Sequence, residues 1–115
     1  MTISTSVVGA VTVIRLRGTL GAAEGGDPGL RPAIRKAVDS GARAVVINLQ
    51  DVSAIDSSGI ADLASSHMTL ASSGGRLKLS NLSQKLKDIF AITRLNGVFD
   101  THETEDHAIA SFEAS

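Results

Sequence analysis

Two short runs rich in β-branched residues open the chain. Ile3 to Val8 and Val11 to Arg17 contain many Val, Ile and Thr residues, a pattern that predicts two strands. Gly9-Ala10 lies between them and fits a two-residue hairpin turn with glycine in the first position. The next segment, Gly18 to Gly26, holds four glycines in nine positions. It favours a loop, with room for one short strand near Thr19-Leu20.

Helical spacing follows the glycine-rich segment. Asp27-Pro28 predicts the start of a helix, because an acidic N-cap precedes proline at the first helical position. Gly41 predicts the end of this helix. The apolar residues between these points recur at helical spacing: Leu30, Ala33, Ile34, Ala37 and Val38. The run from Ala44 to Leu49 is then almost continuously apolar, as in a central strand covered on both faces.

The chain then continues to alternate helices with strands. A second helix is expected from Ser57 or Ser58 to about Ser73, where Gly74-Gly75 ends it. Arg76 to Ser80 has the pattern of another strand. Alternation of this kind after an opening hairpin predicts an α/β fold with parallel crossover connections.

The last third of the chain predicts two more helices. Ser83 is the expected N-cap of a third helix, with Leu82 as its hydrophobic staple, and Asn96-Gly97 marks its end. Val98-Phe99 has the pattern of one short strand, and a final helix is expected around Glu103 to Glu113. The residues expected to face inward from these helices are Leu86, Ile89, Phe90, Ala108, Ile109 and Phe112.

Composition excludes several classes of function. The length of 115 residues suits one domain, residues 1–115, and the 43% apolar share predicts a packed core. Only 3% of residues are aromatic and the net charge is −1, so neither base stacking nor a basic stripe supports nucleic-acid binding. Cysteine is absent, which removes thiolate nucleophiles and zinc–thiolate sites. We expect a cytoplasmic domain without membrane insertion.

The stretch from Asp51 to Ile60 carries the strongest functional signal. It follows the apolar strand and leads directly into the second helix. A helix N-terminus has unpaired N–H donors and a partial positive charge, so it favours anions. A hydroxyl at this point, as on Ser58, is suited to carry a switchable phosphate. Ser57 is the expected structural cap, with Asp56 as a further acceptor for the first amides.

The second helix is expected to present a polar face to solvent. At about 100° per residue, the apolar side holds Ile60, Leu63, Ala64, Leu70 and Ala71. The opposite side holds Ser58, Asp62, Ser65, Thr69 and Ser72. Ser58 heads this small, nearly uncharged face, and Gly59 beside it would let a partner's backbone approach closely. The face is a candidate docking surface.

At this point the sequence resembles the STAS domains, and within them the bacterial anti-sigma factor antagonists. The likeness extends from about Val11 to Phe112, with landmarks in the family's order and with similar gaps. These landmarks are Val45-Val46-Ile47-Asn48-Leu49, Asp56-Ser57-Ser58-Gly59-Ile60, Gly74-Gly75-Arg76-Leu77 and Leu95-Asn96-Gly97-Val98-Phe99. The resemblance implies a single STAS-like α/β domain: a mixed β-sheet with an N-terminal hairpin and about four helices packed on it.

The resemblance also implies a regulatory cycle. An anti-sigma factor with serine kinase activity phosphorylates the second serine of the motif, here Ser58 (Ser57 being the alternate), and a serine phosphatase reverses the reaction. The unphosphorylated form binds the anti-sigma factor. Catalysis then belongs to the partners, and this chain needs no cofactor. The expected partner-binding residues are Asp56, Ser57, Ser58, Gly59, Asp62, Ser65 and Thr69.

Two positions depart from the family's pattern. Family members often carry aspartate in place of Asn48, and another acid within the segment that here consists of Gly18-Thr19-Leu20-Gly21. Acids at both places would be expected near the phosphorylation loop. The departures leave open a second function, that of a constitutive scaffold or accessory subunit docking on the ATPase of an ABC lipid transporter.

Other chemistries find less support in the sequence. A hydrolase using Ser58 as nucleophile would need a base, and no element places a histidine beside it. His102, Glu103, Asp106 and His107 do not have the two-histidine spacing of a zinc helix, so a solvated first turn is favoured over a metal site. His67 falls on the apolar side of the second helix, as a core or edge residue would. We expect a monomer or a weak homodimer, with the opening hairpin edge as its candidate contact.

Overall fold

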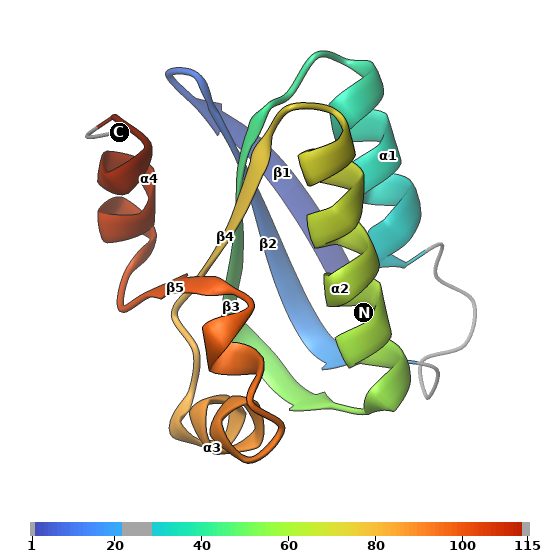
Figure 1. Cartoon of the computed structure of the whole chain (residues 1–115), viewed down its shortest axis with the longest axis vertical. Coiled ribbons are helices and arrows are strands. Elements are labelled where there is room, and N and C mark those ends of the chain that lie inside the picture. The colour runs from blue at the N-terminus through green and yellow to red at the C-terminus, as the bar shows by residue number, and fades with distance from the viewer. Residues whose placement is uncertain (1, 22–28, 114–115) are drawn as a thin grey trace.

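A five-stranded sheet with helices on both faces forms the domain in the computed structural model, which describes residues 2–21 and 29–113 (Figure 1). The strands are β1 (Thr2–Val8), β2 (Val11–Leu20), β3 (Ala44–Ile55), β4 (Arg76–Ser80) and β5 (Asp100–His102). The helices are α1 (Leu30–Asp39), α2 (Ser57–Ser72), α3 (Gln84–Ile92) and α4 (Glu105–Glu113), with a 3₁₀ turn at Leu95–Gly97. The predicted α/β class is confirmed.

The strands lie side by side in sequence order, β1-β2-β3-β4-β5. β1 and β2 are antiparallel, and the other neighbours are parallel, so the sheet is mixed. The hairpin pairs Val8 with Val11 across Gly9-Ala10. Gly9 has a φ of +60°, whereas Ala10 does not have a positive φ. This is the type II′ pattern, which requires glycine in the first turn position.

The two faces of the sheet are covered unequally. Alternate residues of β3, such as Val45 and Ile47, point into the main core with buried residues of α1, α2 and α3. Val46 points the other way and packs with Ala108 and Ile109 of α4. Figure 1 accordingly shows α1 and α2 on one side of the sheet and α4 on the opposite side. No helix among the described residues is long and apolar enough to cross a membrane.

Both strands that lead to the start of α2 are longer than the sequence pattern predicts. The short strand expected near Thr19-Leu20 is confirmed, but it continues β2 through Gly18 without an intervening loop. An irregularity between Gly18 and Thr19 shifts the register and lets the pairing resume. β3 likewise continues to Ile55, directly before α2. The rest of the glycine-rich segment, residues 22–28, lies outside the described residues.

Helix ends are the least accurate part of the sequence prediction. α1 begins at Leu30 after Gly29, and the expected cap Asp27-Pro28 lies outside the described residues. α3 ends at Ile92, before Asn96-Gly97, because Arg94 adopts a left-handed conformation with a φ of +61°. The predicted strand at Val98-Phe99 is wrong: Phe99 is buried in the core, and β5 begins one residue later.

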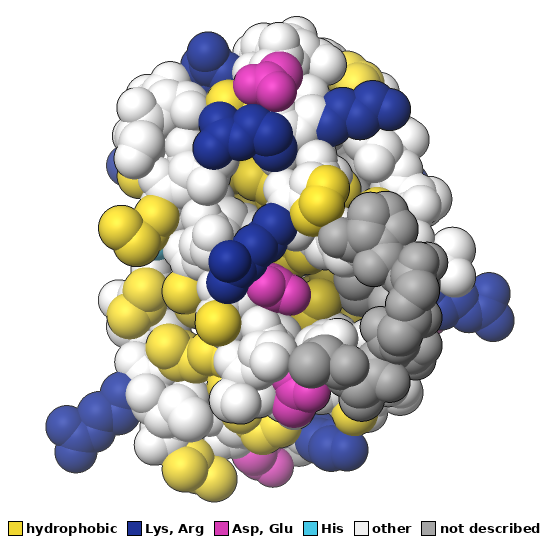
Figure 2. All heavy atoms as spheres, turned by 90° about the vertical axis from the view of Figure 1, so that its right-hand side faces the viewer, with side chains coloured by type: hydrophobic (Ala, Val, Ile, Leu, Met, Phe, Trp, Pro, Cys, Tyr) yellow, Lys and Arg dark blue, Asp and Glu magenta, His cyan; other side chains and the backbone are white. Residues whose placement is uncertain are grey.

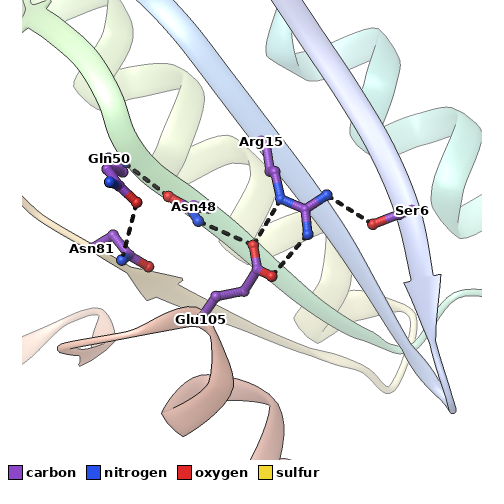
Figure 3. Close-up of polar contacts among 6 residues, drawn as sticks. All are labelled: Ser6, Arg15, Asn48, Gln50, Asn81 and Glu105. Atoms are coloured by element: carbon purple, nitrogen blue, oxygen red, sulfur yellow. Dashed lines mark hydrogen bonds and ion pairs between the residues drawn. The ribbon is translucent and has the colours of Figure 1, made fainter.

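A polar network attaches α4 to the sheet (Figure 3). Arg15 on β2 donates to both carboxylate oxygens of Glu105, over 3.0 Å from Nε and 2.8 Å from Nη2. Asn48 on β3 donates a further hydrogen bond of 3.0 Å to Glu105. Burial would raise the pKa of the Glu105 carboxyl, but the hydrogen bonds from Arg15 and Asn48 and the Arg15 charge lower it overall.

Asn48 therefore does not lie where the sequence led us to expect. Its side chain is on the α4 face of the sheet, opposite the face that packs against α1 and α2. An acid at position 48 would meet the Glu105 carboxylate and not the start of α2. The amide instead supplies a donor to Glu105, and its oxygen accepts a hydrogen bond of 2.9 Å from the Gln50 N–H.

Candidate functional site

The candidate site forms where the ends of β2 and β3 meet the first turn of α2. The Asp56 N–H donates a hydrogen bond of 3.3 Å to the Leu20 carbonyl, which joins the two strand ends. Asp56 has an extended conformation, and its Oδ1 accepts a hydrogen bond of 2.9 Å from the Gly59 N–H. Asp56 is thus the N-cap of α2. The expectation that Ser57 caps the helix is wrong.

Gly59 is buried beneath this turn. A Cβ atom added there would lie 2.2 Å from the Leu20 carbonyl oxygen and 2.8 Å from the Ile55 side chain. The glycine allows α2 to approach the end of β2 closely. Its predicted role, to let a partner's backbone approach, is wrong because the chain itself occupies that space.

Gly21, which directly follows β2, also lies beside the start of α2. A Cβ atom at this position would overlap the Asp56 carboxylate, and Gly21 has a φ of +149° that favours glycine. The segment from Gly18 to Gly21 therefore reaches the α2 start, as expected, whereas Asn48 does not. The position nearest the cap carries no side chain of its own.

Ser57 and Ser58 remain exposed at the first two helical positions. Among the described residues, neither hydroxyl takes part in a hydrogen bond. Because Asp56 supplies the cap, the Ser58 hydroxyl is free for other chemistry. The helix dipole also favours a negative group at this end of α2.

The other predicted docking residues on α2 face α1 more than solvent. Asp62 accepts a hydrogen bond of 2.8 Å from Arg31 Nε, forming an ion pair between the two helices. Ser65 and Thr69 are partly buried and line a hollow of about 310 Å³ beside Arg31 and Arg35. The same two residues also line the neighbouring hollow beside Met68, so they lie between α1 and the exposed side of α2.

The exposed crest of α2 consists of Ala61, Met68 and Ser72, of which only Ser72 belongs to the polar face that the helical spacing predicts. Ala61, Met68 and Ser72 are exposed, and the Met68 side chain is 67% exposed. They line a second hollow of about 570 Å³, which also includes Arg35 of α1. Figure 2 shows the side of the molecule on which α1 lies, where Lys and Arg side chains stand beside hydrophobic ones. The helical period alone could have found Ala61 and Met68, but only the position of α1 decides which polar residues are covered.

His67, His102 and Glu103 have separate partners. His67 packs edge-on against Phe99, with 5.8 Å between ring centroids, as an inward-facing residue would. His102 lies 3.0 Å from Asp100, and Glu103 lies 3.1 Å from Lys87. No group of three or more metal-ligating side chains gathers within the part of the chain that the structure describes.

Comparison with known proteins identifies the domain. The family model of the STAS domain matches residues 2–108, nearly the whole described chain. The chain belongs to the STAS domain family. Residues 56–60 thus lie in the turn between a parallel strand and helix of a STAS domain.

Relatives of known name fall within this family. The chain is 41% identical over 54 residues to the anti-sigma-B factor antagonist of Bacillus subtilis (strain 168), a match that covers 47% of this chain and 50% of the relative. The match thus spans about half the length of that relative.

Two solved structures of one protein are also similar. The anti-sigma factor antagonist SpoIIAA in its unphosphorylated form has a TM-score of 0.73 and 25% identity, covering 99% of this chain and 100% of that one. The phosphorylated form of SpoIIAA, a Bacillus cell fate determinant, has a TM-score of 0.70 and 26% identity, covering 96% and 99%.

Proposed function

We propose that this STAS domain is an anti-sigma factor antagonist that is switched off by phosphorylation of Ser58. The observation that carries the proposal is that the Ser58 hydroxyl is exposed at the start of α2. The first turn of this helix is capped by Asp56 and does not need the Ser58 hydroxyl. The likeness to SpoIIAA, known in unphosphorylated and phosphorylated forms, supports the same kind of switch here.

The geometry suits a modification that leaves the fold intact. Since Asp56 and not Ser58 supplies the cap, a group added to Ser58 breaks no hydrogen bond within the described residues. A phosphate adds about −1.5 to −2 charge, which the N-terminal end of a helix tolerates. The same charge beside the exposed crest of α2 repels acidic groups on a docked partner. Binding can thus be lost without refolding.

The partner in this proposal is an anti-sigma factor with serine kinase activity, and a serine phosphatase restores the binding form. The anti-sigma factor contacts the start of α2 and then the exposed crest with Ala61 and Met68. Arg31 and Arg35 of α1 border this surface and add positive charge to it. The chain acts as substrate and binding module, so the phosphoryl-transfer catalysis belongs to the kinase.

One observation favours a second function. Gly21 stands beside Asp56, where a further acid would be accommodated only with a different backbone. A kinase that relies on an acid at that place would not act on this chain. The same surface would then serve a constitutive contact, such as docking on a transporter ATPase.

The test is capture of partners from the native lysate with four forms of the protein: wild type, Ser58→Ala, Ser58→Asp and Thr101→Asp. Thr101→Asp is the matched control, because it adds the same charge at an exposed position on β5 and not on α2. A serine-kinase anti-sigma factor retained by all forms except Ser58→Asp supports the proposal. Equal retention by all four forms contradicts the switch, and a transporter ATPase as that common partner favours the second function.

A further inference from the structure

β1 forms one edge of the sheet, and its hairpin register determines which backbone groups face outward. In a two-residue hairpin the pair that flanks the turn, here Val8 and Val11, is hydrogen-bonded, and such pairs then alternate along the ladder. Ile3, Thr5 and Val7 therefore occupy the non-hydrogen-bonded positions opposite β2. Their N–H and C=O groups point to the outer side, where no described strand pairs with them.

The two edges of the sheet differ in how they discourage pairing with another chain. β5, at the far edge, has three residues and carries Asp100 and His102, and short, charged strands pair poorly. β1 has seven residues, Thr-Ile-Ser-Thr-Ser-Val-Val, with no charge and no proline. None of the usual features that block an exposed edge occurs on this strand.

An apolar hollow lies beside the same edge. Thr5 and Val7 line it together with Ala33 and Ala37 of α1, and its volume is about 620 Å³. Val7 is 70% exposed, so a large aliphatic side chain stands uncovered beside this hollow. Ile3, two positions before Thr5, already packs against the main core. The edge residues whose backbone groups no described strand pairs thus include an uncovered aliphatic residue, Val7.

We propose that β1 pairs with β1 of a second copy of this chain, antiparallel, with Thr5 on the two-fold axis. In that register Thr5 faces Thr5, and Ile3 faces Val7 of the other copy. All three positions are those with outward N–H and C=O groups, so the two edges are complementary to each other. Each hydrogen-bonded pair exchanges two bonds, so the three pairs contribute about six.

The symmetry of the outward groups about Thr5 is what favours a second copy over another protein. Ile3 and Val7 are equally spaced on either side of Thr5, and pairing them covers the exposed Val7 side chain with an aliphatic partner. A homodimer of this kind forms one continuous sheet. α1 separates the contact from the Ser58 surface, because Ala33 and Ala37 face β1 whereas Arg31 and Arg35 face α2. Both Ser58 sites therefore stay open.

The first experiment is sedimentation equilibrium of the purified full chain from about 1 to 500 μM. A weak dimer dissociates at the low end of this range and associates at the high end. Wild type should approach twice the monomer mass with rising concentration. Thr5→Lys should remain a monomer, since it places like charges directly opposite each other on the axis. Thr101→Lys, the matched substitution on β5, should dimerise like wild type. A wild type that is monomeric throughout overturns the proposal, as does a Thr5→Lys variant that dimerises normally.

The register has its own test, because the chain contains no cysteine. In a hydrogen-bonded antiparallel pair the two Cα atoms lie about 5.5 Å apart, within the range that a disulfide spans. Thr5→Cys should therefore form a covalent dimer on mild oxidation. Val7→Cys, on the same edge, would lie about 13 Å from its copy and should not. Absence of the Thr5→Cys cross-link, or equal cross-linking by Val7→Cys, contradicts this register. Both experiments use the protein alone, so their outcome is independent of the Ser58 switch.

Discussion

The Asn48 side chain donates a hydrogen bond of 3.0 Å to Glu105, a residue 57 positions later in the chain. Asn48 lies on β3 and Glu105 opens α4, so the bond ties the C-terminal helix to the middle of the sheet (Figure 3). An amide at position 48 is matched to the acid at position 105. The departure from the family's aspartate is thus compensated within this chain and lies away from the start of α2.

Replacing Asn48 by aspartate should destabilise the fold. The change removes the donor to Glu105 and places two carboxylates at hydrogen-bond distance, and we expect a loss of about 1–3 kcal/mol in the free energy of unfolding. Urea denaturation at neutral pH measures this loss. The double variant Asn48→Asp, Glu105→Gln should recover much of the loss, because the neutral amide can again donate to the acid. Equal stability of Asn48→Asp and wild type would contradict the role of this contact.

Stability should depend on pH through Glu105. Its folded-state pKa is lowered, so it releases its proton more readily in the folded chain than in the unfolded chain. The resulting stabilisation is fully present above the unfolded pKa and is lost as the pH falls through the lower, folded value. Glu105→Gln should therefore flatten the acid limb of a plot of unfolding free energy against pH. Glu103→Gln is the control, since Glu103 is 74% exposed and its pair with Lys87 is weak. An unchanged acid limb in Glu105→Gln would count against the network.

Gly59→Ala should disturb the site through packing. The added Cβ atom would lie 2.2 Å from the Leu20 carbonyl oxygen, so the first turn of α2 must move away from β2. We expect a destabilisation of about 1–3 kcal/mol and a lower melting temperature. Gly97→Ala is the matched control, because nothing lies within 4 Å of its added Cβ atom. Equal effects of the two substitutions in thermal melts would argue that Gly59 has no special packing role.

The exposed crest of α2 should matter for binding but not for folding. Met68→Asp replaces a side chain that is 67% exposed, so the melting temperature should change little. Affinity for the partner captured through the Ser58 surface should fall by about tenfold or more, as for a buried contact residue. Val98→Asp, also exposed but on the segment after α3, serves as the control. Undiminished binding by Met68→Asp would place the partner contact elsewhere.

The period of the apolar residues was sufficient to predict the order of helices and strands. The apolar pattern of a buried strand or helix face reflects only which residues are buried. The structure buries the residues that carried this pattern, among them Val45 to Ile47, Leu63 and Leu70. Helix ends were harder. α3 ends at Ile92 because Arg94 has a left-handed conformation, and nothing in the local sequence indicates that conformation. Val98-Phe99 has the apolar pattern of a strand, but an apolar side chain in a loop can also be buried in the core, as that of Phe99 is.

The position of Asp56 to Gly59 at the start of α2 was predictable from the sequence, but the contacts that they make there were not. An Asp-Ser-Ser-Gly segment leaves three candidates for the cap, and only the bond from the Gly59 N–H to Asp56 decides among them. Burial of Gly59 depends on Leu20, which lies far away in sequence. Likewise, a helical wheel cannot show that α1 covers Thr69 and pairs with Asp62. These contacts join residues that are far apart in the sequence, so the local sequence pattern does not predict them.

The central claim is that a charge on Ser58 controls partner binding without altering the fold. The most direct measurement is the dissociation constant, by titration calorimetry, of the captured anti-sigma factor with unmodified protein and with protein phosphorylated on Ser58. We predict that phosphorylation weakens binding about 5- to 150-fold, while the circular dichroism spectrum and melting temperature stay the same. Equal dissociation constants for the two forms would contradict the claim.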